Sequence, residues 1–414
     1  MTYNNAREYI KNLNPNRIVP GLNSIKALCR LLGDPQKKLK YIHIAGTNGK
    51  GSAGAFTESI ILASDSSVAR FSSPSVGDYL QMFTINGKPV TRELYTECVM
   101  EISSVMPMLH RDGIFPTSFE AETAAAFLMF AKNMPDYVIT ECGMGGMDDC
   151  TNIIPSPLVC IITPISYDHR LFLGETLDAI ATHKAGIIKR GASVVTSQQL
   201  PDCMAPITKA SKKNGSPLYV ASDISNISYG SNSTKFIFEG NKYEIPLLGV
   251  FQPQNAALAI KTAQLLGINE HDIKSGLAAA KWEYRFERIG RYILDGAHNE
   301  AAAAALVDSL KIYATGSNAF ICGCFRDKDY MKIARITAPY ADAVYCVTPP
   351  TSRGLESKVL ADAFEKYTNI VYDHKNTDEA IYAASKKNYD NIIIFGSLSI
   401  LNDAKKTIER IGSL

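Results

Sequence analysis

Hydrophobic runs rich in β-branched residues alternate with stretches of helical periodicity along the first half of the chain. The helical stretches include Ser52–Ala63 and Glu120–Ala131. The strand-like runs are Tyr41–Ala45, Tyr137–Thr140, Leu158–Thr163 and Ser193–Thr196. Strands that alternate with helices predict a parallel sheet covered by helices.

The pattern changes between Ile227 and Leu247. Short alternating segments occur there, broken by Gly230-Ser231-Asn232-Ser233 and by Gly240-Asn241. This arrangement predicts a small antiparallel insert. Apolar residues at helical spacing in Gln254–Leu266 then predict a buried helix that closes the first unit.

A second alternation begins at Tyr292 and predicts a smaller, Rossmann-like α/β unit. Its strand candidates are Tyr292–Leu294, Ala319–Cys322, Ala343–Val347, Ile370–Tyr372 and Asn391–Phe395. The junction is expected near Trp282–Ile289, so we predict a first domain over residues 1–286 and a second over residues 287–414. The chain length of 414 residues suits two domains.

Composition excludes several classes of function. Lys and Arg number 43 against 41 Asp and Glu, a formal charge of +2, which favours neither nucleic acid nor an anionic membrane. The nine cysteines show no C-x-x-C pair, and the chain has neither a signal-peptide pattern nor an apolar run long enough to span a bilayer. We therefore expect a cytoplasmic protein with free thiols.

The strongest local signal is the segment Tyr41-Ile42-His43-Ile44-Ala45-Gly46-Thr47-Asn48-Gly49-Lys50-Gly51-Ser52. An apolar strand runs into a Gly-rich turn that contains a lysine and then into a helix. Glycines let backbone N–H groups turn toward phosphate oxygens, the helix N-terminus adds positive potential, and Lys50 can reach the β/γ-phosphates. The segment predicts a phosphate-binding loop.

This loop departs from the common G-x-x-x-x-G-K-[ST] pattern. Ile44 occupies the position of the first glycine, and Gly51 separates Lys50 from Ser52. The alternative interpretation is a strand-to-helix turn with an incidental lysine. Strand, glycines, lysine and hydroxyl in this order favour nucleotide binding, so the fold class predicted is a P-loop ATPase domain with a parallel sheet, followed by a smaller Rossmann-like domain.

A bound nucleoside triphosphate requires Mg²⁺, which prefers oxygen ligands from one or two carboxylates and from the phosphates. Glu141 follows the strand Tyr137–Thr140 and precedes a Gly-rich turn. Its carboxylate is therefore expected at the carboxyl edge of the sheet, near the phosphate loop. On its position alone, Glu141 is equally compatible with a solvated loop residue.

The loop variant Gly46-Thr47-Asn48-Gly49-Lys50-Gly51-Ser52 resembles that of the folylpolyglutamate synthase/dihydrofolate synthase group of the Mur ligase superfamily. The resemblance continues in order over most of the chain. Its further motifs are Ser73-Pro74, Phe119-Glu120, Glu141-Cys142-Gly143-Met144-Gly145-Gly146, Thr151-Asn152, Asp168-His169, Lys184-Ala185-Gly186-Ile187-Ile188, Gln252 to Ala257, Arg285-Phe286-Glu287, Leu294-Asp295-Gly296-Ala297-His298-Asn299, Asp327-Lys328-Asp329 and Phe395-Gly396-Ser397-Leu398.

The resemblance implies a set of site residues. Magnesium ligands are implied at Ser73, Glu141, His169 and Lys184, the last in a carboxylated form. ATP contacts are implied at Gly46 to Ser52 and at Asn255, Arg285 and Asp295, for which a helix cap, an ion pair and a turn residue are the respective alternatives. Lys50, His169, Lys184, Arg285 and His298 are the candidate catalytic residues.

The implied reaction is ATP-dependent amide formation between L-glutamate and a pterin carboxylate, through an acyl phosphate, by a cytoplasmic and monomeric enzyme. Candidate substrate contacts are Thr117, Phe119, Glu120, Asp149 and Ser397. Phosphoryl transfer requires charge neutralisation, which Lys50, Arg285 and Mg²⁺ can supply.

Departures from the resembled family concentrate at the pterin-facing segments. The family usually carries a histidine and, further on, a Glu-Arg pair after Ser73-Pro74, where this chain has Ser75, Gln81 and Met82. After Gly145-Gly146 the family usually has Arg-Leu-Asp, whereas this chain has Met147-Asp148-Asp149. Losing a cation and gaining an acid weakens the attraction for an anionic substrate. A ligase for a different carboxylate therefore stays open as the alternative.

Overall fold

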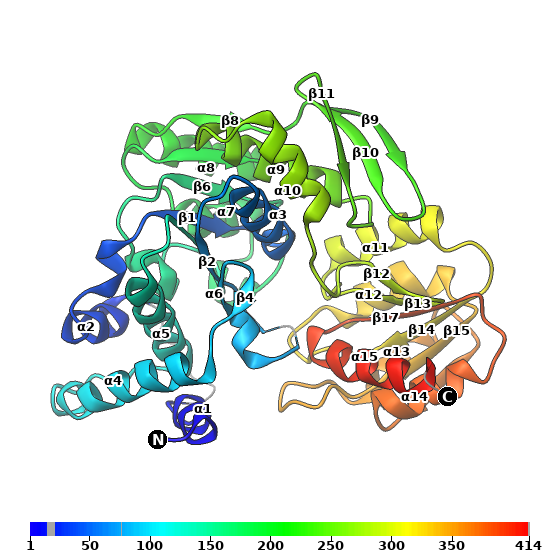
Figure 1. Cartoon of the computed structure of the whole chain (residues 1–414). Helices are drawn as coiled ribbons and strands as arrows, with labels where there is room; N and C mark the ends of the chain where they lie inside the picture. Colours follow the sequence, from blue (N-terminus) through cyan, green and yellow to red (C-terminus); the bar gives the residue numbers. More distant parts are fainter. Residues whose placement is uncertain (15–20, 76, 413–414) are drawn as a thin grey trace. The chain divides into compact units, whose positions relative to one another are not determined.

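The computed structural model describes residues 1–14, 21–75 and 77–412, which form two compact units (Figure 1). The first unit comprises Met1–Ile224 and Gln254–Ala280, and the second comprises Ser225–Pro253 and Lys281–Leu414. The chain therefore enters the second unit at Ser225, returns to the first unit at Gln254, and enters the second unit again at Lys281.

The first unit is built on a sheet of eight strands in the order β4-β3-β2-β5-β1-β6-β7-β8. The strands from β2 to β8 in this order are parallel, and β3 and β4 add an antiparallel edge. This confirms the predicted parallel sheet. Their bounds are β1 Tyr41–Ala45, β2 Val68–Phe71, β3 Phe83–Ile85, β4 Lys88–Pro89, β5 Tyr137–Glu141, β6 Val159–Ile162, β7 Ser193–Thr196 and β8 Leu218–Val220.

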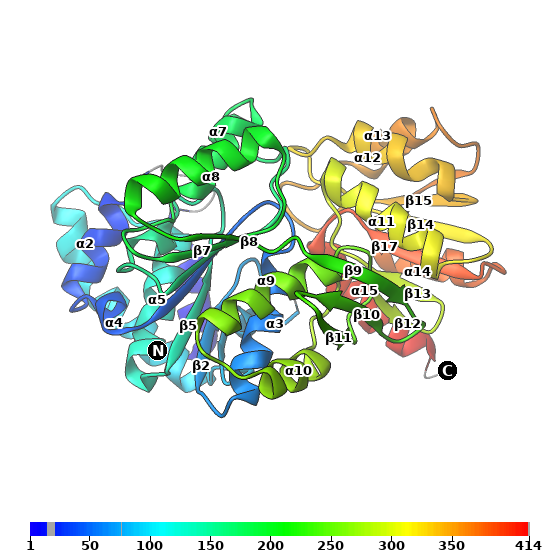
Figure 2. The same cartoon turned by 90° about the horizontal axis from the view of Figure 1, so that it is seen from above.

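Helices cover both faces of this sheet. Figure 2 shows α7 and α8 on one side of the strands and α3, α9 and α10 on the other. The helices are α1 Tyr3–Lys11, α2 Asn23–Leu31, α3 Lys50–Ala63, α4 Arg92–Arg111, α5 Ser118–Asn133, α6 Arg170–Leu173, α7 Leu177–Ala185, α8 Pro201–Asn214, α9 Gln252–Leu265 and α10 Glu270–Ala279; the 3-10 helices are η1 Pro35–Lys38, η2 Tyr79–Met82 and η3 Cys150–Ile153.

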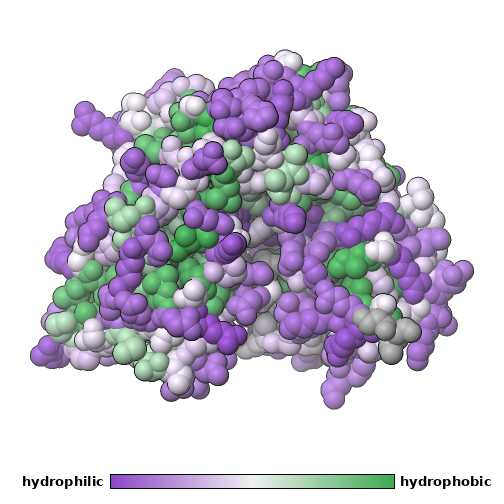
Figure 3. Space-filling model, viewed as in Figure 1, coloured by the Kyte–Doolittle hydropathy of each residue, from purple (hydrophilic) through white to green (hydrophobic). Residues whose placement is uncertain are grey.

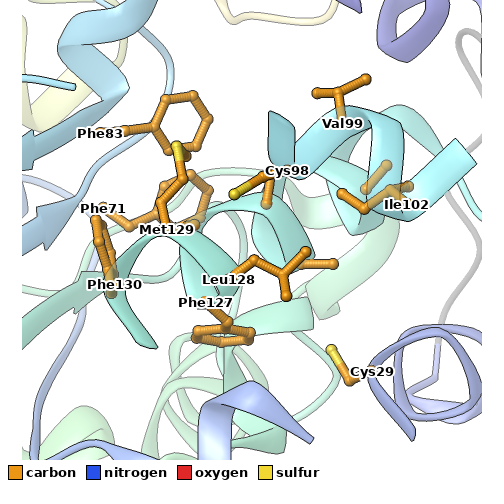
Figure 4. Packing of buried hydrophobic residues seen from close by; sticks show 14 of the residues in the cluster. Cys29, Phe71, Phe83, Cys98, Val99, Ile102, Phe127, Leu128, Met129 and Phe130 are labelled. Carbon is orange, nitrogen blue, oxygen red and sulfur yellow. The ribbon is translucent and has the colours of Figure 1, made fainter. Parts of the chain in front are cut away.

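The core beneath α4 and α5 is rich in aromatic side chains (Figure 4). Phe71 of β2 stacks on Phe83 of β3 with ring centroids 5.5 Å apart, and Tyr41 of β1 meets Phe127 of α5 edge-on at 6.0 Å. Aromatic side chains bury large apolar areas and dominate the energetics of such a core. This packing fixes α5, whose first turn carries predicted substrate residues, against the sheet.

The second unit contains a sheet of six strands in the order β12-β13-β17-β14-β15-β16, parallel except for β12. The predicted antiparallel insert is a separate sheet in the order β11-β10-β9, and it begins within the first unit and continues in the second. The strands are β9 Ile224–Tyr229, β10 Thr234–Phe238, β11 Asn241–Ile245, β12 Glu287–Ile289, β13 Tyr292–Leu294, β14 Asn318–Cys322, β15 Ala343–Val347, β16 Val371–His374 and β17 Asn391–Phe395.

Helices again lie on both faces of the larger sheet. Figure 2 shows α11, α12 and α13 on one side and α14 and α15 on the other. The side chains follow the two-residue period of a strand, since Phe320 and Cys322 face the α11 side while Ile321, between them, points away. The elements are α11 Glu300–Tyr313, α12 Tyr330–Thr337, η4 Ala338–Tyr340, α13 Ser357–Phe364, α14 Thr377–Ser385 and α15 Leu398–Gly412.

Among the described residues, no helix is both long enough and apolar enough to cross a bilayer. On the face drawn in Figure 3, apolar residues form separate patches between hydrophilic ones.

The packing of α10 on α3 generates a stability prediction. A Cβ on Gly276 would collide with the backbone of Ile60 and Ser59, which cannot move without displacing α3. Gly276→Ala is expected to lower the free energy of unfolding by about 1–3 kcal/mol, the usual penalty of overpacking. Ser275→Ala, at the exposed neighbouring position of the same helix, is the control and should change it by less than about 0.5 kcal/mol. Urea denaturation followed by circular dichroism measures both; equal effects would contradict the close helix contact.

Candidate functional site

The predicted phosphate loop connects the carboxyl end of β1 to the first turn of α3. Gly46 and Gly49 both have positive φ, +151° and +90°, which L side chains rarely adopt. Thr47 N–H donates to the Pro164 carbonyl at 3.0 Å, and the Thr47 hydroxyl donates to the Ser166 carbonyl at 3.0 Å. The loop is therefore held against the residues that follow β6.

Gly46 is the most crowded point of this loop. A Cβ there would collide with Thr163 Oγ1. Lys184 Nζ donates to the Gly46 carbonyl at 2.7 Å, and Lys50 Nζ donates to the same oxygen at 3.3 Å. The structure thus brings together two lysines that the sequence places 134 residues apart (184 − 50).

The two lysines differ in their surroundings. Lys184 is 3% exposed. Its burial lowers the pKa of Lys184 to about 7, and the nearby charge of Lys50 acts in the same direction. Lys50 lies nearer to solvent, and its Nζ is 3.8 Å from Glu141 Oε1. Lys184 is therefore the residue of the pair whose amine is neutral in a substantial fraction of molecules near neutral pH.

Asn255 and Glu141 complete the surroundings of the loop. Asn255, in α9, is buried, and its Oδ1 occupies the space that a Cβ on Gly49 would need. Glu141 is the last residue of β5 and is 8% exposed. Lys50, Glu141, Lys184 and Asn255 thus surround one turn, in the arrangement expected of a phosphate site at the carboxyl ends of parallel strands.

The other predicted metal ligands lie in connections that leave this sheet. Ser73 precedes a cis peptide bond to Pro74. His169 has a left-handed backbone, with φ +51°, and its Nε2 is 3.9 Å from Asp168 Oδ1. Within residues 1–14, 21–75 and 77–412, no group of three or more His, Cys, Asp or Glu side chains is arranged to hold a metal ion. The four-residue metal set stays a prediction.

A buried polar network, not predicted from the sequence, lies beneath the Gly-rich turn after β5. His43 Nε2 lies 2.8 Å from Thr151 Oγ1, and the Thr151 hydroxyl donates to Asp149 Oδ1 at 2.6 Å. Since that hydroxyl gives its proton to the carboxylate, its oxygen accepts from His43 Nε2–H, which assigns the tautomer. Cys142 Sγ is 3.2 Å from the same nitrogen.

Burial explains the electrostatics of this network. Burial lowers the pKa of His43 to about 3, so the ring is neutral. Burial also raises the pKa of Asp149, although several hydrogen bonds to its carboxylate act in the opposite direction. Asp149 Oδ2 also accepts from Met144 N–H at 2.9 Å. Asp149 therefore holds the turn 143–151 together. The available sequence signal was a histidine within the otherwise apolar run Tyr41–Ala45.

Two predicted substrate residues cap α5. Thr117 Oγ1 accepts from Glu120 N–H at 3.2 Å, and Glu120 Oε2 accepts from Thr117 N–H at 2.7 Å, which makes a capping box. Phe119, between them, stacks on Phe71 with centroids 6.1 Å apart and lies against Gly143. The structure gives this segment a local role, and its contact with a substrate stays a prediction.

The residues that depart from the resembled family differ in exposure. Met147 is 42% exposed and packs on Gly186, and Asp148 Oδ2 lies 3.8 Å from His183 Nδ1. Met82, by contrast, is buried in the core beneath α4. The acid gained at position 148 therefore has a histidine partner, whereas Met82 is a packing residue.

In the second unit, Asp295 follows β13 and is 5% exposed. Its carboxylate accepts from Phe286 N–H and Ala297 N–H, each at 2.8 Å. Burial raises the pKa of Asp295, and the charge of Arg285 opposes this. A Cβ on Gly296 would collide with the Arg285 guanidinium, so that the glycine lets Arg285 lie across this turn.

His298 and Ser397 lie close to the same turn. His298 Nδ1 is 2.7 Å from the Gly296 carbonyl, which can only accept, so the proton resides on Nδ1. Gly396, beside Ser397, donates its N–H to the Ala297 carbonyl at 2.9 Å. The four residues predicted in this unit, Arg285, Asp295, His298 and Ser397, thus gather at the carboxyl ends of the neighbouring strands β13 and β17.

Comparison with known families matches both parts of the chain. Residues 44–263 match the Mur ligase middle domain, and residues 284–398 match the Mur ligase glutamate ligase domain.

Several known proteins are similar over their whole length. The dihydrofolate synthase/folylpolyglutamate synthase of Bacillus subtilis is 33% identical, covering 98% of this chain and 99% of that protein. Folylpolyglutamate synthase of Mycobacterium tuberculosis, solved with ADP and AMPPCP, has a TM-score of 0.90 at 27% identity and 98% coverage of both chains. FolC of Escherichia coli, solved with DHPP and ADP, has a TM-score of 0.88 at 26% identity, covering 100% of this chain and 99% of that one.

The geometry of the loop generates a prediction about nucleotide affinity. Gly49→Ala forces an L side chain into a positive φ and against Asn255, so we expect the affinity for a nucleoside triphosphate to fall about tenfold or more. Gly54→Ala, in the helix that follows the loop, is the control, because its Cβ would make only ordinary contacts, 3.5 Å to Ile44 and 3.7 Å to Arg70. Titration with a fluorescent ATP analogue measures both variants. Similar affinities for the two would contradict the assigned loop.

Proposed function

Because the chain belongs to the folylpolyglutamate synthase/dihydrofolate synthase family of Mur ligases, we propose that it joins L-glutamate to the carboxylate of a pterin substrate at the expense of ATP. It is an ATP-dependent acid–amino-acid ligase of folate metabolism. Its substrates are small molecules.

The observation that carries this function is the convergence of Lys50 and Lys184 on the Gly46 carbonyl, beside the Glu141 carboxylate. Lys50 and Gly46 belong to a loop whose N–H groups and helix N-terminus suit bound phosphates, and Lys184 and Glu141 approach this loop from α7 and β5. Phosphoryl transfer needs charge neutralisation and positioning rather than a protein nucleophile. The site supplies both.

The reaction has two steps. A carboxylate oxygen of the pterin substrate attacks the γ-phosphorus of ATP, the bond to ADP breaks, and an acyl phosphate forms. The α-amine of glutamate then attacks the acyl carbon, loses a proton, and expels inorganic phosphate. We assign to Lys50 the stabilisation of charge on the transferring phosphoryl group, and to Arg285 the same charge-neutralising role.

Mg²⁺ belongs to the same proposal. Glu141 suits it because a buried carboxylate at a strand end, next to the phosphate loop, is the donor that this ion prefers. When bound, Mg²⁺ neutralises charge on the phosphate oxygens. Ser73, His169 and a carboxylated Lys184 are the further ligands proposed, and Asn255 and Asp295 are the proposed contacts of the base and the ribose.

The acceptor is proposed to be dihydropteroate, a folyl-glutamate, or both. Thr117, Phe119, Glu120 and Asp149 are its proposed contacts, and Ser397 is the proposed contact of glutamate. No comparison favours the alternative ligase for a different carboxylate. We also propose that the enzyme is a monomer, and that it works in the cytoplasm because its nine cysteines are free thiols.

The function is tested by supplying the purified protein with ATP, Mg²⁺ and glutamate together with dihydropteroate, tetrahydrofolate or neither. We expect phosphate release that depends on a pterin, and a product one glutamate residue heavier by mass spectrometry. Lys50→Ala is expected to lower kcat by about a hundredfold or more because it removes a cation from the transferring phosphoryl group. Nucleotide binding without product on either pterin would reject the folate assignment and favour another carboxylate.

The environment of Lys184 supports its carboxylation. A neutral lysine amine attacks CO2 to give a carbamate and one proton, and the lowered pKa of Lys184 supplies the neutral amine. The carbamate retains one N–H, which can still donate to the Gly46 carbonyl. Conversion of the buried cation to an anion would add a carboxylate near the proposed Mg²⁺ site.

This modification has a direct test. In ¹³C-bicarbonate near neutral pH, the protein is expected to show a carbamate carbon signal by NMR that Lys184→Gln abolishes. Lys189→Gln is the matched control, because Lys189 is also part-buried, with a pKa lowered by burial to about 8, but donates to the carbonyls of Asn152 and Ile154. A turnover-competent protein without the signal would show that Lys184 acts as an unmodified amine.

A further inference from the structure

A polar cluster that the reaction does not use lies between η2, α1, α4 and α5 of the first unit. Tyr79 of η2 donates its hydroxyl proton to Glu122 Oε1 of α5 at 2.8 Å. Tyr79 and Tyr95 of α4 join their hydroxyl groups at 3.1 Å. The Arg7 guanidinium of α1 lies over the Tyr79 ring, 4.4 Å from its centroid.

These contacts determine the direction of the hydrogen bonds. Tyr79 gives its proton to the carboxylate, so its oxygen accepts from the Tyr95 hydroxyl. The phenol of Tyr79 is therefore fully engaged, and its ring is held by aromatic contact with Phe83 at 5.9 Å and Tyr95 at 5.6 Å. Glu122 is the final acceptor in this series of hydrogen bonds.

Glu122 links two segments of the proposed acceptor site. Ser72, adjacent to the predicted ligand Ser73, donates its N–H to the carbonyl of Met82, the last residue of η2, at 3.0 Å. The bond from Tyr79 to Glu122 then ties η2 to the first turns of α5, where Thr117 and Phe119 lie. Removing this bond would loosen η2, and with it the Ser72-Ser73 segment, from the start of α5, while Phe119 stays stacked on Phe71.

We propose that Glu122 is a positioning residue, which holds η2 and the adjoining Ser72-Ser73 segment against the start of α5. In this position the two segments can bind the acceptor carboxylate substrate together. This inference rests on the proposed function, because the two segments are the predicted contacts of the acceptor and of Mg²⁺.

The hydrogen bond from Tyr79 to Glu122, called the tether below, is sensitive to pH in the neutral range. Burial raises the pKa of Glu122 to about 7, whereas the hydrogen bond from Tyr79 and the charge of Arg7 act in the opposite direction. Tyr95 and Arg92 face the cluster from α4, and Tyr3, which contacts the Tyr95 ring and lies under Arg92, faces it from α1. Above pH 7 the ionised carboxylate accepts a charge-assisted bond, which is stronger than the bond to its protonated form.

The test compares the KM of each substrate in Glu122→Leu, Tyr79→Phe and Glu122→Gln. In the first two variants we expect the KM of the pterin to rise about five- to tenfold, with the KM of ATP and kcat within about twofold, because a charge-assisted hydrogen bond is lost away from the nucleotide. Glu122→Gln keeps a neutral acceptor for Tyr79, so its pterin KM should lie between those of the natural protein at pH 8 and of Glu122→Leu. Glu97→Gln, an exposed acid on α4, is the control and should change neither KM.

The pH profile separates this role from a general loosening of the fold. The pterin KM of the natural protein should rise as pH falls from 8 to 6, since Glu122 gains a proton, and Glu122→Gln should flatten that dependence. A pterin KM within twofold of the natural value in both Glu122→Leu and Tyr79→Phe would overturn the inference, as would an equal rise in the KM of ATP.

Hydrogen exchange provides a readout that does not depend on turnover. The backbone N–H groups of residues 79–83 should exchange faster in Glu122→Leu and Tyr79→Phe than in the natural protein and in Glu97→Gln. If no pterin is ligated but this exchange difference is seen, the proposed function fails while the tether stands. Unchanged exchange would show that Glu122 does not hold η2.

Discussion

The close approach of three segments at Gly46 is the constraint on which the candidate site depends. The glycine lies against Thr163, and its carbonyl accepts from both Lys50 and Lys184, so a strand end, a helix start and the end of α7 are joined at one peptide group. The proximity of the Lys50 charge and, above all, burial lower the pKa of Lys184, which favours its neutral form at this shared acceptor. The phosphate loop is thus held in position by contacts within the chain itself.

In each unit, a buried carboxylate holds a turn in place by accepting hydrogen bonds from backbone N–H groups. Asp149 and Asp295 both come after a strand, and both are almost fully buried. Asp149 accepts backbone N–H groups of its own turn, whereas Asp295 accepts one from its own turn and one from Phe286, before β12. Burial raises the pKa of each carboxyl, and the hydrogen bonds oppose that rise. A buried acid that satisfies its own loop fixes the direction of the neighbouring side chains, Cys142 and His43 in one unit and Arg285 in the other.

Much of the fold could be predicted from local pattern. The strands β1, β7, β13, β15 and β17 have the predicted bounds, because strands buried on both faces read as continuous apolar runs. β2 was missed because Arg70 interrupts its apolar run; only in the folded chain does Glu58 of α3 pair with that guanidinium, at 3.1 Å. The chain path through β9–β11, which crosses from one unit to the other, has no local signature either.

For the site, the sequence by itself determined the Gly-rich loop proposed to bind phosphate, the glutamate at a strand end, and the family, since these depend on residue types at short, ordered spacings. Tertiary structure alone decided that Lys184 meets Gly46, that His43 joins Thr151 and Cys142, and that Glu122 receives the Tyr79 hydroxyl. The physical reason is that these contacts join residues far apart along the chain. Which side chains meet, and which pKa values shift as a result, depends on the packing of whole helices against the sheet rather than on any neighbouring sequence.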